Sequence, residues 1–251
     1  MANNFANTIN STIGASNSGA TNTFTITNPS NTASSAARET ITVGGATSDD
    51  PSLNFNVSGV TNWEMGCDNS DSDAFVLSAS ATLGTTNVMR ISTAGEINYP
   101  LQPAFLGVLG TNDTNATGNG ATYTLGTGNA LTEIFDQGGD FTTAGVFTSP
   151  VTGRYQLSYN LTYSSLTAAM TFVAANITTS NRVYATNYIN IGLVRTVAAA
   201  ADLGYSASTA LADMDAADTF TVTAAIHGGA GNTVTINTTS ARVFMCGFLA
   251  C

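Results

Sequence analysis

The stretch DFTTAGVFTSPVTGRYQLSYNL, residues 140–161, decides the fold of this chain. Proline leads turns and is excluded from central strands, so Pro150 and Gly153 predict a turn. Beyond it, large apolar residues recur at every second position, namely Tyr155, Leu157, Tyr159, Leu161 and Tyr163. A period of two indicates a β-strand with one apolar face. The stretch therefore predicts a short strand, a tight turn and a long two-faced strand.

The same stretch carries the spacing G-x-F-x-x-P-x-x-G-x-Y-x-x-S, at Gly145, Phe147, Pro150, Gly153, Tyr155 and Ser158. This spacing resembles the C1q/TNF-like jelly roll. Three more segments resemble that family in the right order: an opening strand at 103–108 (PAFLGV), a late strand with an acidic approach at 210–225, and a closing strand at 241–250 (ARVFMCGFLA).

The resemblance implies an all-β jelly-roll sandwich that assembles as a homotrimer. It also implies apolar faces that meet around a threefold axis. We expect the strand from Tyr155 to Tyr163 and the aromatic closing strand to supply those faces.

The composition bounds the class of protein. The 251 residues hold sixteen acidic and six basic groups, all of the latter arginine, and the formal net charge is −10. Nucleic acid and anionic membrane surfaces both bind clustered Lys and Arg, so we expect neither as a partner. No apolar run reaches the roughly 18 residues of a membrane span, and residues 1–14 lack the regions of a signal peptide. We therefore expect no membrane insertion, and synthesis in a host cytoplasm.

Residues 1–98 divide into an anchor and a small β module. In residues 1–20, Phe5, Ile9 and Ile13 recur at four-residue spacing, which predicts either a short helix that docks onto a partner or a disordered tail. Residues 21–98 contain short strand patterns between turn clusters, at 23–27, 39–43, 53–57, 63–67, 74–77 and 88–91. Such strands look too short and too polar on both faces for a core of their own. Association of three chains would bury those faces.

This region also resembles a module of phage tail-fibre and virion proteins. The residues that carry the likeness are W-x-M-G-x-D-N-S-D-S-D at 63–73, A-F-V-L-S at 74–78, L-G-T at 83–85 and M-R-I-S-T-A-G-E-I at 89–97. The connector at 99–103 (YPLQP) is stiff because it contains two prolines. It marks the start of the jelly-roll head, residues 99–251.

Within the head, the polar segment 111–120 (TNDTNATGNG) predicts a surface loop. Residues 198–201 predict a helical turn or a loop. The glycines of 228–231 (GGAG) predict a hairpin between strands at 220–226 and 234–236. Further strands are predicted at 123–125, 133–136, 170–177 and 183–194.

Two acidic clusters are candidate metal sites, since Ca²⁺ prefers carboxylate and hydroxyl oxygens. The first is DNSDSD, with Asp68, Asp71 and Asp73. It lacks the central glycine and the bidentate glutamate of an EF-hand loop, and the same residues build Asx turns. The second cluster is formed by Asp213, Asp215 and Asp218. Some C1q-like heads bind Ca²⁺, and the alternative is a solvated approach to the strand at Phe220.

The three cysteines and the single histidine do not indicate a catalytic or metal-binding site. Cys67 and Cys246 are expected to be small buried apolar residues, and Cys251 a free thiol, because no close cysteine pair exists for a metal or a disulfide framework. His227 is expected to be a surface or hairpin histidine. No G-x-S-x-G, H-E-x-x-H or phosphate-binding glycine loop occurs. We expect no enzyme and no cofactor other than Ca²⁺.

The leading hypothesis is a bacteriophage virion protein, a trimeric fibre or spike. It would attach to a tail or capsid protein through residues 1–20 and present its head to a host-surface glycan or protein. The alternative is a capsid decoration protein that binds the shell as a trimer. A third class, a depolymerase, would need a carboxylate pair in a groove.

Overall fold

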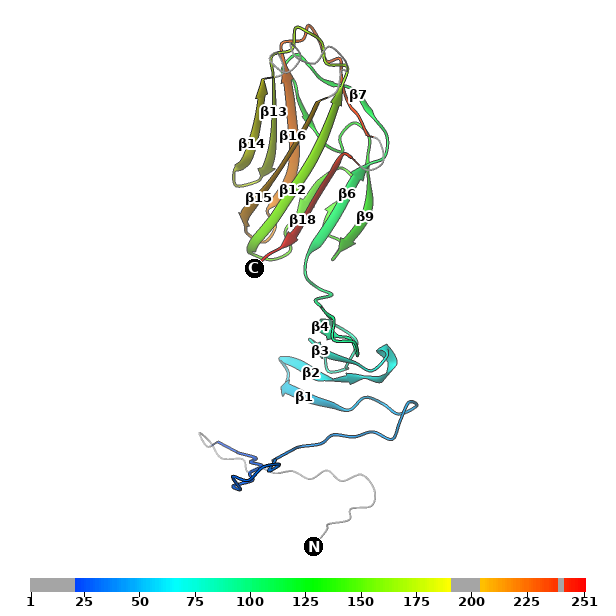
Figure 1. The fold of residues 1–251 in the computed structure, drawn as a ribbon, viewed down its shortest axis with the longest axis vertical. Helices are drawn as coiled ribbons and strands as arrows, with labels where there is room; N and C mark the ends of the chain where they lie inside the picture. Colours follow the sequence, from blue (N-terminus) through cyan, green and yellow to red (C-terminus); the bar gives the residue numbers. More distant parts are fainter. Residues whose placement is uncertain (1–20, 191–203, 239–241) are drawn as a thin grey trace.

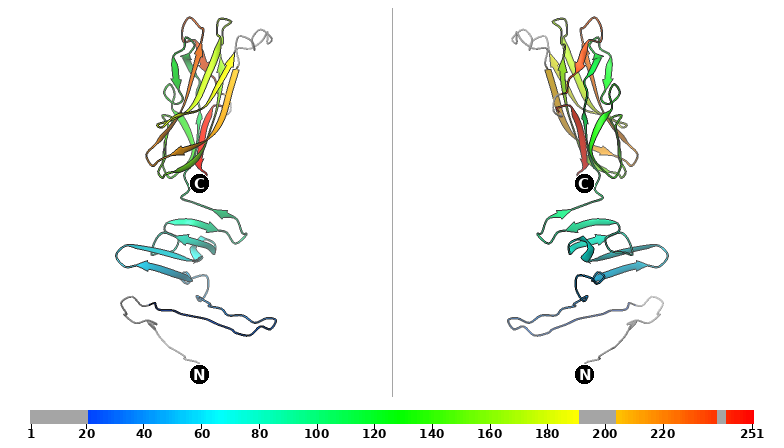
Figure 2. Two further views of the ribbon diagram at one scale, coloured as in Figure 1. Left: turned by 90° about the vertical axis from the view of Figure 1, so that its left-hand side faces the viewer. Right: turned by 90° about the vertical axis from the view of Figure 1, so that its right-hand side faces the viewer.

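The computed structural model describes residues 21–190, 204–238 and 242–251. An extended segment, a small sheet and a larger head follow one another along the long axis, and the C-terminus lies at the base of the head (Figure 1). Both side views show the same succession (Figure 2). The predicted anchor at 1–20, the segment 198–201 and residues 191–194 of a predicted strand lie outside the described residues.

The small sheet has five antiparallel strands in chain order, β1-β2-β3-β4-β5. Their bounds are Ser52–Val57, Thr61–Asp68, Ala74–Ser78, Asn87–Ile91 and Ile97–Asn98. A short 3₁₀ helix, η1 (Asn69–Asp71), joins β2 to β3. A small cluster of Ala74, Val76 and Leu83 is buried against the sheet. The predicted strands at 53–57, 63–67, 74–77 and 88–91 are confirmed.

The predicted strands at 23–27 and 39–43 are wrong, because residues 21–51 form no strand. The alternation of TFTIT and ETITV is that of a strand, but a strand also needs a neighbour to pair with its backbone. Phe24, Ile26 and Ile41 remain exposed instead.

The head contains two antiparallel sheets. The seven-stranded sheet has the order β9-β6-β18-β12-β17-β7, and β15 also pairs with β12. Its strands are β6 (Ala104–Leu109), β7 (Asp113–Thr117), β9 (Leu131–Gln137), β12 (Gly153–Ser164), β15 (Gly204–Met214), β17 (Val234–Ile236) and β18 (Phe244–Leu249).

The six-stranded sheet has the order β10-β11-β16-β13-β14, and β8 also pairs with β16. Its strands are β8 (Thr122–Thr124), β10 (Phe141–Thr142), β11 (Val146–Thr148), β13 (Phe172–Thr179), β14 (Val183–Asn190) and β16 (Thr219–His227). The run β6-β18-β12-β15 of one sheet packs against β11-β16-β13-β14 of the other, which is the double-sheet arrangement of a jelly roll. The predicted all-β jelly-roll head is confirmed.

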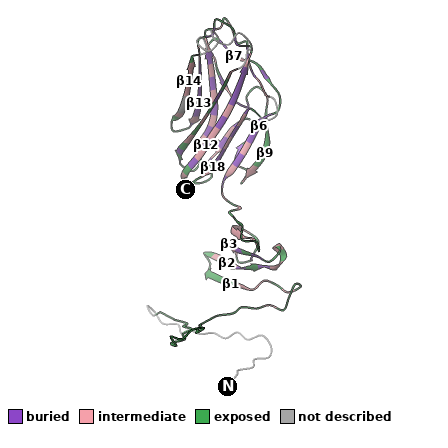
Figure 3. Cartoon of the chain, viewed as in Figure 1, coloured by how far each residue is buried: buried purple, intermediate pink, exposed green. Residues whose placement is uncertain are grey.

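One apolar core fills the space between the two sheets, and buried residues accordingly concentrate in the head (Figure 3). Phe105 lies at its base, with the ring of Phe141 stacked 4.9 Å away and that of Phe147 stacked 4.6 Å away. The alternating residues of β12, from Tyr155 to Tyr163, are all buried in this core. The expectation that this aromatic face meets other copies of the chain is therefore wrong, since only the polar face of β12 is turned outward.

Three further predictions about the head need correction. Residues 113–117, predicted as loop, form β7, in which Asp113 and Thr117 are buried. Gly204–Met214 forms β15, whose first six residues lie before the late strand expected at 210–225, because the small residues SASTA did not signal a strand. Residues 228–231 do not close a hairpin, because β16 and β17 belong to different sheets. Among the described residues, no helix is long and apolar enough to cross a membrane.

Candidate functional site

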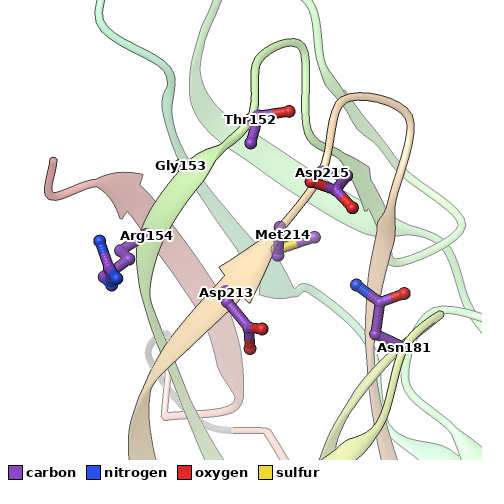
Figure 4. Close-up of a pocket in the computed structure, with 7 residues that line it drawn as sticks. All are labelled: Thr152, Gly153, Arg154, Asn181, Asp213, Met214 and Asp215. Atoms are coloured by element: carbon purple, nitrogen blue, oxygen red, sulfur yellow. The ribbon is translucent and has the colours of Figure 1, made fainter.

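The second acidic cluster lies at the base of the head, where the β13–β14, β15–β16 and pre-β12 loops come together. A cavity of about 180 Å³ opens there, lined by Thr152, Gly153, Arg154, Asn181, Asp213, Met214 and Asp215 (Figure 4). The contacts of its carboxylates decide what this cavity can bind.

The Asp213 carboxylate is engaged by the neighbouring strand. The hydroxyl of Tyr184 donates to its Oδ1, and Nη2 of Arg182 lies 2.9 Å from its Oδ2. The Tyr184 hydrogen bond, assisted by the charge of Arg182, lowers the pKa of Asp213 below its usual range. The pKa of Tyr184 is raised, first by partial burial and then by the same hydrogen bond. Asp213 thus ties β15 to β14.

The Asp218 carboxylate joins the two loops above it. Its Oδ1 accepts from the hydroxyl of Ser180 at 2.7 Å, and its Oδ2 accepts from the side-chain amide of Asn181 at 2.5 Å and the backbone amide of Asp215 at 2.7 Å. The Ser180 hydrogen bond and the Asp215 amide lower the pKa of Asp218. Asp218 therefore joins the β13–β14 loop to the β15–β16 loop. We call these three hydrogen bonds the Asp218 latch.

Neither predicted calcium cluster gains support from this geometry. Asp68 caps η1 by accepting from the amides of Ser70 and Asp71. Asp71 pairs with Arg90, and that hydrogen bond lowers the pKa of Asp71. In the described part of the chain, no three His, Cys, Asp or Glu side chains gather as a metal would require.

An aromatic row lies at the opposite end of the head, on the outer face of the six-stranded sheet. Strand register places His227 of β16 opposite Phe172 of β13, and Tyr188 of β14 opposite the residue two positions further along β13. The ring of Phe172 stacks on that of His227 at 4.2 Å and 11°, and the Tyr188 ring lies 6.2 Å from Phe172. Tyr188 is 72% exposed. The three rings lie side by side, with the Tyr188 ring tilted by 42° against that of Phe172. Phe172 and His227 are half-buried, and Tyr188 is the member that is open to solvent.

The loop before β8 supports this row. A Cβ added at Gly120 would lie 2.9 Å from Nδ1 of His227, so the loop approaches the imidazole closely. His227, expected to be a surface or hairpin histidine, is half-buried at the end of β16. Sequence reasoning missed the row because its three residues come from three strands, and no single alternating pattern contains them.

The outer face of the seven-stranded sheet has a different character. Along its central strand β12 it presents Gln156, Ser158 and Asn160. Large apolar side chains flank this polar strip and are exposed, among them Tyr205, Leu211, Phe248 and Phe135. Outward positions of β6, β12, β15 and β18 carry no charged side chain apart from Arg154 and Asp213 at the base.

The cysteines only partly follow expectation. Cys246 is half-buried on this outer face, and burial raises the pKa of its thiol. Cys67, expected to be buried, is exposed on the small sheet, so that prediction is wrong.

No protein-family model and no curated protein sequence matches the chain. Solved structures similar to it include murine APRIL and Eiger TNF. Murine APRIL matches with a TM-score of 0.40 at 9% sequence identity, over 59% of this chain and 98% of its own. Eiger TNF from S. frugiperda matches with a TM-score of 0.35 at 10% identity, over 60% of this chain and 93% of its own.

Proposed function

We propose that the chain is a non-enzymatic attachment protein of a bacteriophage particle, a homotrimeric fibre or spike whose head binds a glycan on the host surface. The anchor at residues 1–20 would join it to a tail or capsid protein. The observation that carries the proposal is the aromatic row of Phe172, Tyr188 and His227, with Tyr188 exposed, at the end of the head farthest from the small sheet.

The aromatic row suits a sugar ring. A pyranose has apolar C–H faces and hydroxyls around its edge, so it stacks on a flat aromatic surface and hydrogen-bonds at the rim. Tyr188 contributes both a ring and a hydroxyl, and the imidazole of His227 adds ring nitrogens. A single row of this size binds weakly, and three copies on one particle would multiply the contact.

The outer face of the seven-stranded sheet supports self-association through the head. A rotation axis sets identical surfaces near each other, which repels like charges and favours apolar or small polar residues. This face carries exposed Tyr205, Leu211 and Phe248, and the outward positions of β6, β12, β15 and β18 hold no charge above the base. The number three follows from the resemblance to C1q/TNF-like heads. In such a trimer the six-stranded sheet and its aromatic row would remain outside.

Binding tests the proposal directly. The full chain, labelled with a fluorophore, is incubated with a panel of bacterial strains and with their purified lipopolysaccharides and wall polysaccharides. Tyr188→Ala should weaken binding to the recognised polysaccharide at least about tenfold, the loss expected of one stacking anchor. Tyr99→Ala is the matched control, because Tyr99 is also an exposed tyrosine but lies in the connector below the head. Equal binding by all three proteins would overturn the assignment of the row.

Location on the particle separates the two virion hypotheses. Antibodies against the head should label purified virions at the tail. Regular labelling of the capsid shell would favour the decoration protein, and absence of label from virions would contradict both. Release of reducing sugar from the recognised polysaccharide would show a depolymerase instead.

A further inference from the structure

The five-stranded small sheet has one face that is apolar except for Thr61, which lies opposite Val57. Antiparallel partners share a face of a sheet, and register aligns Leu53 with Met65, Met65 with Leu77, and Leu77 with Met89. We call the whole surface the apolar face of the small sheet; it is formed by Leu53, Phe55, Val57, Trp63, Met65, Cys67, Phe75, Leu77, Met89, Ile91 and Ile97. The expectation that this module is polar on both faces is therefore wrong.

The charged side chains of the same strands lie on the opposite face. Glu64 shares its register row with Ser78, and Arg90 shares its row with Val76. That opposite face also holds the small buried cluster with Leu83 and the ion pair of Arg90 with Asp71. The charged side chains of these five strands thus all lie on one side of the sheet.

The apolar face is open to water in the single chain. Phe55 is 54% exposed, Val57 58% and Ile97 56%, and Trp63 is 39% exposed. Large apolar side chains present about 150–250 Å² each, so the face leaves on the order of 600 Å² or more of apolar surface uncovered. That exceeds what a monomer usually exposes in one patch and approaches the roughly 800 Å² that each partner buries in a stable interface.

The chain's own extended segment covers only one corner of this face. Ile41 lies across a cavity of about 250 Å³ from Leu53, Met65 and Phe75, with Glu39 at its rim. Phe55 and Ile97, on the two edge strands, are exposed, and Leu77, Met89 and Ile91 between them are half-buried.

We propose that the apolar face of the small sheet is a self-association surface whose occupant is the same face of further copies of this chain. Three observations favour a second copy over another partner. The face approaches the area of a stable interface. It carries no charged side chain, so identical faces that meet at a symmetry axis would not repel each other, and both edge strands of the sheet are open. This surface is separate from the head, so the inference goes beyond the proposed function and does not depend on what the head binds.

Trp63 provides a built-in probe, because it is the only tryptophan of the chain and lies on this face. In the full-length protein at micromolar concentration, the emission of Trp63 should be blue-shifted and resistant to acrylamide quenching. Dilution that dissociates the assembly should remove both effects. Phe55→Glu places a charge on the apolar face, directly opposite Trp63, and should raise the quenching constant severalfold.

Asn56→Glu is the matched control, because Asn56 neighbours Phe55 on β1 but points to the opposite face, where its partner is the uncharged Asn62. It should leave the quenching of Trp63 unchanged. Ile97→Glu, on the other edge strand, is an independent variant that should act like Phe55→Glu. Far-ultraviolet circular dichroism equal to that of the wild type shows that each variant is folded.

The outcomes separate this proposal from the attachment function. Trp63 that is fully accessible to acrylamide in a protein whose native mass is that of a trimer would overturn the apolar-face proposal and leave the head trimer standing. Trp63 that stays shielded at every dilution, in a single chain, would show that residues of the same chain cover the face. That result also overturns the proposal.

Discussion

At Gly145 the backbone turns between β10 and β11 with a φ of +77°, and its amide donates to the carbonyl of Thr142 at 2.9 Å. A Cβ added there would lie 2.0 Å from the carbonyl oxygen of Leu125. This glycine begins the G-x-F-x-x-P-x-x-G spacing, and its contact explains why that position tolerates no side chain. The turn at Gly145 also places Phe147 in the aromatic stack at the base of the core.

Gly145→Ala should therefore destabilise the protein by about 2–4 kcal/mol, through left-handed strain together with a backbone clash. Chemical denaturation followed by circular dichroism measures the change. Gly139→Ala is the control, since Gly139 has the same φ of +77° but nothing within 4 Å of the added Cβ. A loss at Gly145 no larger than that at Gly139 would show that the close approach to Leu125 is not required.

At the scale of elements, the Asp218 latch makes the base of the head sensitive to acid. Hydrogen bonds from Ser180 and from the Asp215 amide hold the pKa of Asp218 below its ordinary value of 3.8. A depressed pKa means that the folded state favours the ionised form. The stabilisation is therefore fully present above the ordinary pKa and is lost as pH falls from there through the lowered value.

Asp218→Asn should lower the melting temperature of the head at pH 7, and the difference from wild type should shrink as pH falls below about 4. Thermal scans at a series of pH values measure this. Asp215→Asn, in the same loop, should change the pH dependence much less, because Asp215 enters the latch through its backbone amide. A difference between Asp218→Asn and wild type that stays constant from pH 7 to pH 3 would contradict the latch.

The sequence predicts those strands in which large apolar residues alternate with polar ones, because every second residue of such a strand enters the core. β12 is the clearest, because every second residue from Tyr155 to Tyr163 enters the core. The first part of β15 was missed because its residues are small, and the strand form of β15 comes from eleven register pairs with β12. β7 was missed because it looks like a polar loop. Its Asp113 is buried, accepting hydrogen bonds from the Tyr123 hydroxyl and the Asn129 amide, and both partners are distant in sequence.

The same limit applies to the candidate sites. Sequence placed Asp213, Asp215 and Asp218 at one end of the head, since they are close along the chain, but in the described residues their three carboxylates do not gather as a metal site. The sequence could not show that side chains of the β13–β14 region bind two of these carboxylates. Arg182 and Tyr184 hydrogen-bond to Asp213, and Ser180 hydrogen-bonds to Asp218. The aromatic row and the apolar face of the small sheet both depend on register across strands, which no single stretch of sequence contains.

At the scale of the whole molecule, the head and the small sheet distribute their charged residues in the same way. Each has an outer face without charge over most of its area and another face that carries polar or aromatic groups. The two parts follow each other along one long axis (Figure 1). Copies of the chain joined along this axis would bury both uncharged faces and leave the aromatic rows exposed at the far end.

Sedimentation equilibrium of the full chain at micromolar concentration is the most direct test of this arrangement. The chain has a mass of 25.6 kDa, and we predict a stable species of three times that mass, which dissociates when charges are placed on both uncharged faces by Phe55→Glu and Leu211→Glu. A wild-type protein that sediments as a single 25.6 kDa chain would contradict the account.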